Sequence, residues 1–233
     1  MGLNPNCKPF PVFKKFFQQF RWKRIARQLR KPEGSAGLEV ARRMNQANEF
    51  LYDFTLDEML VSNHQSILEI GFGNGKFFYK QFNRAEELQI TGLDFSDDMI
   101  RAAQSINQDY IEQGKLILIK GQSDKIPFPN SSFDIVFSIN VAYFWDEPQD
   151  HLLEIYRVLR PGGRLYTTIR TPESLAKMPF SHYGFRTYTV EEWKLLCHLN
   201  NLTFIRSAHV HEPEITPAGT IRSVCLVAEK KQL

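Results

Sequence analysis

Three glycines at alternating positions follow a short apolar segment that contains an acid. Residues 66–77 read Ser-Ile-Leu-Glu-Ile-Gly-Phe-Gly-Asn-Gly-Lys-Phe, with the acid at Glu69 and the glycines at Gly71, Gly73 and Gly75. Glycine adopts positive φ without a Cβ clash and lets a ligand lie close to the backbone. The dinucleotide pattern G-x-G-x-x-G would require a small residue where this chain has Lys76. The segment predicts a nucleotide-type turn between a strand and a helix, or a merely tight turn.

A second acid ends the next apolar segment. Residues 88–94 read as a strand closing on Asp94, and Ser96 is a residue type that caps helices. A carboxylate at a strand end can accept hydrogen bonds from both hydroxyls of a ribose. The alternative is that Asp94 is a polar residue of the turn into the helix.

The segments that follow continue this alternation. Residues 115–120 and 133–139 read as strands, the first leading to Gly121-Gln122-Ser123 and the second ending at Asn140. An amphipathic helix and a Pro-Gly-Gly turn then precede a fifth strand at residues 164–169. A helix at 190–199 and strands near 202–210 and 221–228 complete the pattern. Strands alternating with helices predict a parallel sheet with helices on both faces.

Five of these segments resemble the successive motifs of class I S-adenosylmethionine-dependent methyltransferases, closest to the type-11 or ubiquinone/menaquinone-biosynthesis-like group. They are Glu69 to Gly75, Gly92-Leu93-Asp94, Ile126-Pro127-Phe128, Ser132-Phe133-Asp134 and Leu159-Arg160-Pro161-Gly162-Gly163. The resemblance covers about residues 65–170. It implies a Rossmann-like α/β fold, with a seven-stranded, mostly parallel sheet. The expected division is a basic N-terminal helical arm and cap (1–60) and a cofactor-binding domain (61–233).

The resemblance also implies a cofactor, S-adenosylmethionine, with S-adenosylhomocysteine as the product. The glycine turn would hold its methionine part, Asp94 its ribose and the 121–124 loop its adenine. Family members often have Asp where this chain has Gln122, whose side-chain carbonyl accepts the same hydrogen bond. The expected cofactor-binding residues are Glu69, Gly71, Gly73, Gly75, Asp94, Phe95, Met99, Gln122, Ser123 and Asn140.

Methyl transfer from a sulfonium has an activated leaving group, so the protein mainly aligns the reactants and excludes water. The resemblance puts Asn140 and Tyr143 beside the reactive methyl. His182, in the loop at 178–186, has the intrinsic pKa of a general base near neutrality. We therefore take Asn140, Tyr143 and His182 as candidate catalytic residues, with a surface or structural role as the alternative for a lone His. By resemblance only, Asn45, Asn48 and Tyr52 are candidate wall residues of the cofactor pocket.

Composition excludes several other classes of protein. The 233 residues fit one α/β unit, and no segment approaches the ~20 apolar residues of a membrane span. Lys8, Lys14 and Lys15 interrupt any stretch typical of a signal peptide, so we expect a cytoplasmic protein. The three cysteines have no C-x-x-C spacing, and no metal site is expected.

Charge is distributed unevenly along the chain. Residues 1–50 contain eleven Lys or Arg and three Glu, a net of +8, whereas residues 51–233 contain 18 basic and 23 acidic residues, a net of −5. Phe13, Phe16, Phe17 and Phe20 share one helical face and Trp22, Ile25, Ala26 and Leu29 nearly the opposite one, which predicts two short helices or one helix covered on both sides. The break at 30–37 would be a hinge. The arm is either a lid over the cofactor, the outcome that we favour, or a contact for anionic lipid, nucleic acid or an acidic substrate.

The sequence thus predicts an S-adenosylmethionine-dependent methyltransferase acting by in-line displacement on a small-molecule or lipid-like acceptor. A nucleic-acid methyltransferase is supported only by the basic arm, because Asn140-Val141-Ala142-Tyr143 is not the Asn-Pro-Pro-Tyr signature for exocyclic base amines. A non-catalytic S-adenosylmethionine-binding module is a further alternative. An NAD-dependent oxidoreductase is disfavoured by Lys76 and by the later motifs.

Overall fold

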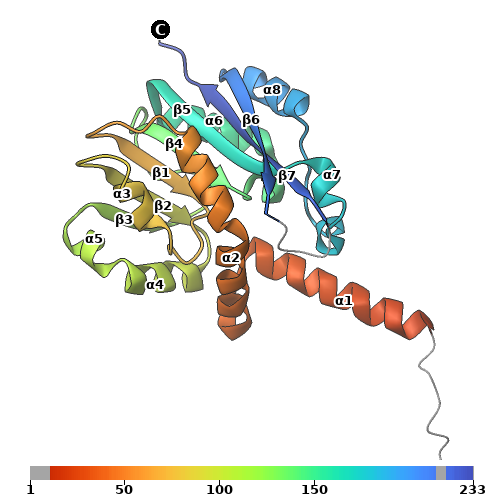
Figure 1. Cartoon of the computed structure of the whole chain (residues 1–233). Helices are drawn as coiled ribbons and strands as arrows, with labels where there is room; N and C mark the ends of the chain where they lie inside the picture. Colours follow the sequence, from red (N-terminus) through yellow and green to blue (C-terminus); the bar gives the residue numbers. More distant parts are fainter. Residues whose placement is uncertain (1–10, 214–218, 233) are drawn as a thin grey trace, which may run out of the picture.

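The fold is built around one seven-stranded sheet, seen in a computed structural model that describes residues 11–213 and 219–232, with backbone only for residues 11–17. The strand order is β3-β2-β1-β4-β5-β7-β6 (Figure 1). The strands are β1 (Ser66–Ile70), β2 (Gln89–Asp94), β3 (Leu116–Lys120), β4 (Phe133–Ile139), β5 (Leu159–Arg170), β6 (Thr203–Glu212) and β7 (Ile221–Glu229). All neighbouring pairs are parallel except those that β7 makes with β5 and β6. The predicted mostly parallel sheet is confirmed.

Helices cover both faces because successive strand residues point to opposite sides. In β1, Ile67 packs with α2 and α3 on one face, whereas Leu68 packs with α6 and α8 on the other. The first face carries α2 (Gly34–Glu58), α3 (Phe78–Phe82), α4 (Asp97–Ile106) and α5 (Gln108–Glu112). The second carries α6 (Pro148–Val158), α7 (Pro172–Leu175) and α8 (Val190–Leu199).

Side-chain caps fix two helix starts, and the first of them was expected from the sequence. The Ser96 hydroxyl accepts a hydrogen bond from the Met99 backbone at 3.4 Å and so fixes the first turn of α4 directly after β2. Thr189 and Glu192 form a reciprocal capping box at the start of α8. The cap at Ser96 matters for the site, because it holds α4 at the carboxyl end of β2.

Of the two alternatives for the N-terminal segment, the structure shows one continuous helix, α1 (Pro11–Arg30). Helix α2 begins at Gly34, so the break is shorter than the expected 30–37. The short connection is fastened to the domain: the Ser96 hydroxyl donates to the Pro32 carbonyl at 2.6 Å, and the Gly34 N–H donates to Asp98 at 2.7 Å. Figure 1 shows α1 extending outward from the sheet domain.

The fifth strand also differs from the expected boundaries. It begins at Leu159, which pairs with Phe133, and a register shift follows before Arg164 pairs with Ile135. The Pro-Gly-Gly segment therefore lies within an irregular strand, with Gly162 at φ 80°.

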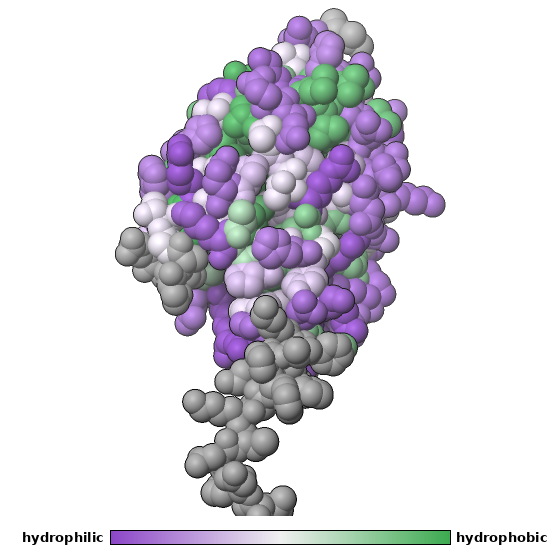
Figure 2. Space-filling model, turned by 90° about the vertical axis from the view of Figure 1, so that its right-hand side faces the viewer, coloured by the Kyte–Doolittle hydropathy of each residue, from purple (hydrophilic) through white to green (hydrophobic). Residues whose placement is uncertain are grey.

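The surface seen in Figure 2 is largely hydrophilic, with hydrophobic residues gathered towards its upper end. Helix α8 lies at that height in Figure 1, and Leu195 and Leu199 of α8 are 57% and 59% exposed. Among the described residues, no helix is both long enough and apolar enough to cross a bilayer.

Candidate active site

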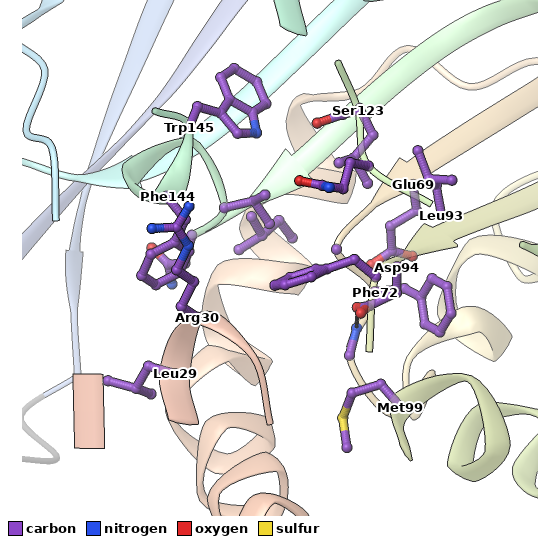
Figure 3. Close-up of a pocket in the computed structure, with 18 of the residues that line it drawn as sticks. Leu29, Arg30, Glu69, Phe72, Leu93, Asp94, Met99, Ser123, Phe144 and Trp145 are labelled. Carbon is purple, nitrogen blue, oxygen red and sulfur yellow. Dashed lines mark hydrogen bonds between the residues drawn. The ribbon is translucent and has the colours of Figure 1, made fainter. Parts of the chain in front are cut away.

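A cavity of about 270 Å³ lies at the carboxyl ends of β1, β2 and β4. This is the edge at which open α/β sheets bind ligands. Figure 3 shows Arg30 and Phe144 on one side of the cavity and Glu69 and Asp94 on the other. The candidate wall residues Asn45, Asn48 and Tyr52 line it. So do nine of the ten expected cofactor-binding residues: Glu69, Gly71, Gly73, Asp94, Phe95, Met99, Gln122, Ser123 and Asn140. Gly75, Tyr143 and His182 do not.

The three glycines all have positive φ but meet different surroundings. Their φ angles are 73° at Gly71, 61° at Gly73 and 69° at Gly75. A Cβ at Gly71 would lie 2.4 Å from Val141, and one at Gly75 would lie 2.7 Å from Ala103 of α4. At Gly73 the same Cβ would meet nothing within 4 Å. Packing therefore requires two of the glycines, whereas Gly73 leaves open space beside the cavity.

The Asp94 carboxylate holds this turn against the end of β2. One oxygen, Oδ2, accepts from the Gly73 N–H at 3.0 Å, and Oδ1 accepts from the Ser96 N–H at 2.9 Å. Burial raises the pKa of Asp94 to about 6, against the opposing effect of these backbone donors. Each oxygen has a further lone pair, so the group can accept hydrogen bonds from a ligand as well.

Glu69 is buried deeper, with two partners on one oxygen. Its Oε2 accepts from the Tyr52 hydroxyl and from Gln81 Nε2, both at 2.5 Å. Burial raises the pKa of Glu69 to about 8. Oε1 has no hydrogen-bond partner in the part of the chain that the structure describes, although Glu69 lines the cavity. A desolvated carboxyl with a vacant oxygen is suited to a cationic or hydrogen-bonding ligand.

Ser123, Trp145 and His151 form another part of the wall. His151 Nδ1 lies 2.7 Å from the Ser123 hydroxyl, and the imidazole stacks on Trp145 with ring centroids 4.8 Å apart and an interplanar angle of 8°. Burial lowers the pKa of His151, which favours the neutral ring. The sequence analysis did not identify His151 as a candidate site residue. The available signal was Pro148, which begins α6 and places position 151 in its first turn, beside the end of β4.

A directed hydrogen-bond relay orients Asn140, whose φ is 58°. The Arg170 backbone N–H donates to the Tyr143 hydroxyl, which donates to Asn140 Oδ1 at 2.8 Å. Asn140 Nδ2 then donates to Asn48 Oδ1 at 3.0 Å. Because a backbone N–H can only donate, the direction of the whole relay is fixed, and the amide nitrogen of Asn48 is its free end.

Tyr143 itself is buried behind this wall. Burial raises the pKa of its hydroxyl well above the ordinary value. The phenol therefore stays protonated and holds Asn140 in place, without facing the cavity.

The end of α1 and the connection to α2 close one side of the cavity. Leu29, Arg30 and Pro32 line it. Arg30 forms an ion pair with Asp146 at 2.6 Å, and this contact holds the pKa of that carboxyl below its usual range. Two elements 116 residues apart in the sequence thus meet at the rim.

The loop that contains His182 lies outside the cavity. His182 ends the short helix η2 (Pro179–His182) and is exposed. Lys23 Nζ of α1 lies 5.8 Å from the ring centroid of the neighbouring Tyr183. The ring of Phe185 packs on the ring of Phe144, with centroids 4.7 Å apart. The loop supports α1 and Phe144 from behind, and a catalytic role for His182 stays a prediction.

No group of three or more His, Cys, Asp or Glu in the described residues could hold a metal ion. Cys197 and Cys225 are buried thiols. Cys7 lies outside the described residues.

Comparisons with known proteins agree with this geometry. A family model described as "Methyltransferase domain" matches residues 68–167. The chain is 30% identical over 128 residues to an uncharacterized methyltransferase, YdaC, of Bacillus subtilis, covering 54% of this chain and 68% of the relative. It is 31% identical over 140 residues to a phthiotriol/phenolphthiotriol dimycocerosates methyltransferase of Mycobacterium leprae, covering 60% of this chain but only half of that relative.

A solved structure resembles the fold over most of its length. Geranyl diphosphate C-methyltransferase from Streptomyces coelicolor, in complex with Mg²⁺, geranyl diphosphate and S-adenosylhomocysteine, superposes with a TM-score of 0.67 at 13% identity. The match covers 85% of this chain and 87% of that one.

Proposed function

Because the chain belongs to the class I S-adenosylmethionine-dependent methyltransferases of the type-11 group, we propose that its cavity binds S-adenosylmethionine and directs the methyl group to a small, largely apolar or lipid-like acceptor. The bound cofactor supplies a methyl carbon on a positively charged sulfur, whose leaving group is already activated. The protein's part is to hold both reactants in line and to exclude water.

The cofactor half of the proposal rests on Gly73, Asp94 and Glu69. The open space at Gly73 admits a ligand against the backbone, and Asp94 accepts hydrogen bonds from ribose hydroxyls. Beside the positively charged amino group of the methionine part, Glu69 would be ionised, and its Oε1 accepts a hydrogen bond from that group. These three features together, on adjacent strand ends, fit the group better than a nicotinamide dinucleotide, whose fingerprint Lys76 interrupts.

The adenine end of the cofactor is proposed to lie at Gln122 and Ser123. Both line the cavity, and the Ser123 hydroxyl is already held by His151. The stacked pair of Trp145 and His151 adds a flat wall to this part of the cavity. His151 is proposed as a positioning residue for Ser123.

The acceptor half rests on the wall made by α2, Asn140 and Phe144. Met44, Asn48 and Phe144 line the cavity there, together with Leu29 of α1. Apolar side chains suit a lipid-like acceptor, and the amide nitrogen of Asn48 can hydrogen-bond an oxygen on it. In this proposal Asn140 touches the reactants, whereas Tyr143 positions Asn140 and acts only through it.

Alignment, not general-base catalysis, is the role that these contacts support. Tyr143 stays protonated, and His182 is exposed outside the cavity. Neither residue is therefore assigned as a general base. The M. leprae relative is named for an acceptor of lipid type, which agrees with a lipid-like acceptor here.

The single observation that carries the proposal is the carboxylate of Asp94 joined to the open Gly73 turn at the cavity. Calorimetry on the full chain should show binding of S-adenosylhomocysteine and no binding of NAD or NADP. The Asp94→Ala variant should lose affinity, whereas Asp97→Ala, an exposed neighbour paired with Lys120, should not. Tighter binding of a nicotinamide cofactor, or equal affinities in both variants, would refute the assignment.

A further inference from the structure

Positive charge is concentrated on α1, the element that extends from the domain. Residues 1–31 contain nine Lys or Arg and no Asp or Glu, whereas residues 51–233 carry a net charge of −5. Figure 1 shows α1 running outward from the sheet, with its last turn beside α2. A basic helix on an acidic body is an electrostatic asymmetry that would orient the protein toward an anionic partner.

One face of α1 presents bases together with an aromatic ring. Phe20, Arg24 and Arg27 follow at spacings of four and three residues, which places them on one face of α1. Lys31, the partly exposed residue directly after the helix, continues this spacing. Phe20 is 58% exposed, and both arginines are exposed. Among the described residues, neither Arg24 nor Arg27 has an ion pair, whereas Arg30 and Lys31 pair with acids. The two arginines are thus available to an external anion.

We propose that this stripe, Phe20, Arg24, Arg27 and Lys31, is a docking surface for an anionic lipid membrane. Bases beside an acidic bilayer gain electrostatic attraction, and an aromatic side chain among them inserts at the boundary between head groups and acyl chains. The bases require a partner surface that is anionic, and the exposed ring requires one that is partly apolar. An anionic bilayer has both properties.

The rim of the cavity favours a membrane over a nucleic acid. Asp146, Glu147 and Asp150 line the cavity beside the end of α1. A polyanion that followed α1 into the cavity would approach these acids, whereas a planar bilayer needs to meet only the projecting helix. The last turn of the same helix contributes Leu29 and Arg30 to the cavity wall. The bilayer is therefore proposed to meet the projecting, basic part of α1 and not the acidic rim, and this docking does not depend on the proposed function.

The test is co-flotation of the full chain with vesicles. The vesicles are phosphatidylcholine alone or phosphatidylcholine mixed with phosphatidylglycerol, each at low and high salt. The Arg24→Gln/Arg27→Gln variant removes two charges from the stripe. The control Lys115→Gln/Lys194→Gln removes two exposed charges from elsewhere on the domain.

We expect binding only to the anionic vesicles, with partition falling steeply as salt rises. The stripe variant should lose on the order of 30-fold in partition coefficient, from about fivefold per base, and the control should match the parent. Equal binding to neutral vesicles, an unaffected stripe variant, or retention by single-stranded RNA in place of vesicles would overturn the proposal. S-adenosylhomocysteine affinity, measured on the same variants, should be unchanged, so a failure of docking is separable from a failure of the proposed function.

Discussion

The Asp94→Asn substitution should move cofactor affinity and fold stability in opposite directions. Asp94 is buried, and its pKa of about 6 lies above the ordinary value of 3.8. The folded, ligand-free protein therefore binds this proton more tightly than the unfolded chain does. Stability from this group is present below the unfolded pKa and is lost as pH rises from 3.8 to about 6.

The magnitudes follow from that shift. The raised pKa corresponds to a cost of about 3 kcal/mol at pH 7. Asparagine removes that cost. Its side chain has one oxygen and cannot accept from both the Gly73 and the Ser96 N–H, and this loss lowers the free energy of unfolding by about 1–2 kcal/mol. The net gain is about 1–2 kcal/mol, or a few degrees in Tm. Affinity for S-adenosylhomocysteine should fall about 10- to 100-fold, because a charged acceptor for the ribose is lost.

The parent protein supplies an independent check through pH. If only ionised Asp94 accepts both ribose hydroxyls, affinity should fall about tenfold between pH 7 and pH 5, since a group of pKa 6 is mostly protonated at the lower pH. The assays are calorimetry with S-adenosylhomocysteine and thermal unfolding over this pH range. Asp97→Asn, an exposed residue three positions away, should change neither result. A flat affinity profile in the parent, or an Asp94→Asn variant that is less stable yet binds normally, would refute the reasoning.

Three further predictions concern the glycine turn, the acceptor side of the cavity and the N-terminal helix. Gly73→Val should abolish S-adenosylhomocysteine binding, whereas Gly75→Ala should mainly lower Tm, because its Cβ would lie 2.7 Å from Ala103; the reverse pattern in calorimetry and melting would contradict these glycine roles. Once an acceptor is known, Tyr143→Phe should lower kcat/KM with cofactor affinity within a few fold, and His182→Ala should do less. Equal losses in the two would argue for His182 in the acceptor site. Deleting residues 8–31 should weaken S-adenosylhomocysteine binding at any salt, since Leu29 leaves the cavity wall; unchanged affinity would speak against a lid.

The sequence by itself determined the sheet and the side of the cavity that is proposed to bind the cofactor. Alternating strands and helices predicted parallel pairing, and parallel strands bring their carboxyl ends to one edge. Glu69, Gly73 and Asp94 stand at or directly after such ends, so their meeting follows from strand pairing alone. These are local patterns, because each depends on a backbone preference or a side-chain alternation within a few residues.

The tertiary structure decided which neighbouring side chains face the cavity. Tyr143 stands between cavity residues in the sequence, yet its hydroxyl is bonded to Asn140 behind the wall. None of residues 178–186 lines the cavity, and His182 is exposed to solvent. His151 enters the wall through a stacked contact with Trp145 that spacing does not encode.

The placement of the N-terminal helices depends on contacts that are still more distant in the chain. Arg30 meets Asp146 across 116 residues, and Pro32 meets Ser96 across 64. Helical periodicity left open whether residues 11–30 form one helix or two, because the aromatic residues occur on both faces. The path of a loop and the position of a helix depend on contacts with residues from many parts of the domain. A pattern of residue types can therefore indicate which strand end bears the site, but only the folded chain determines which side chains close over it.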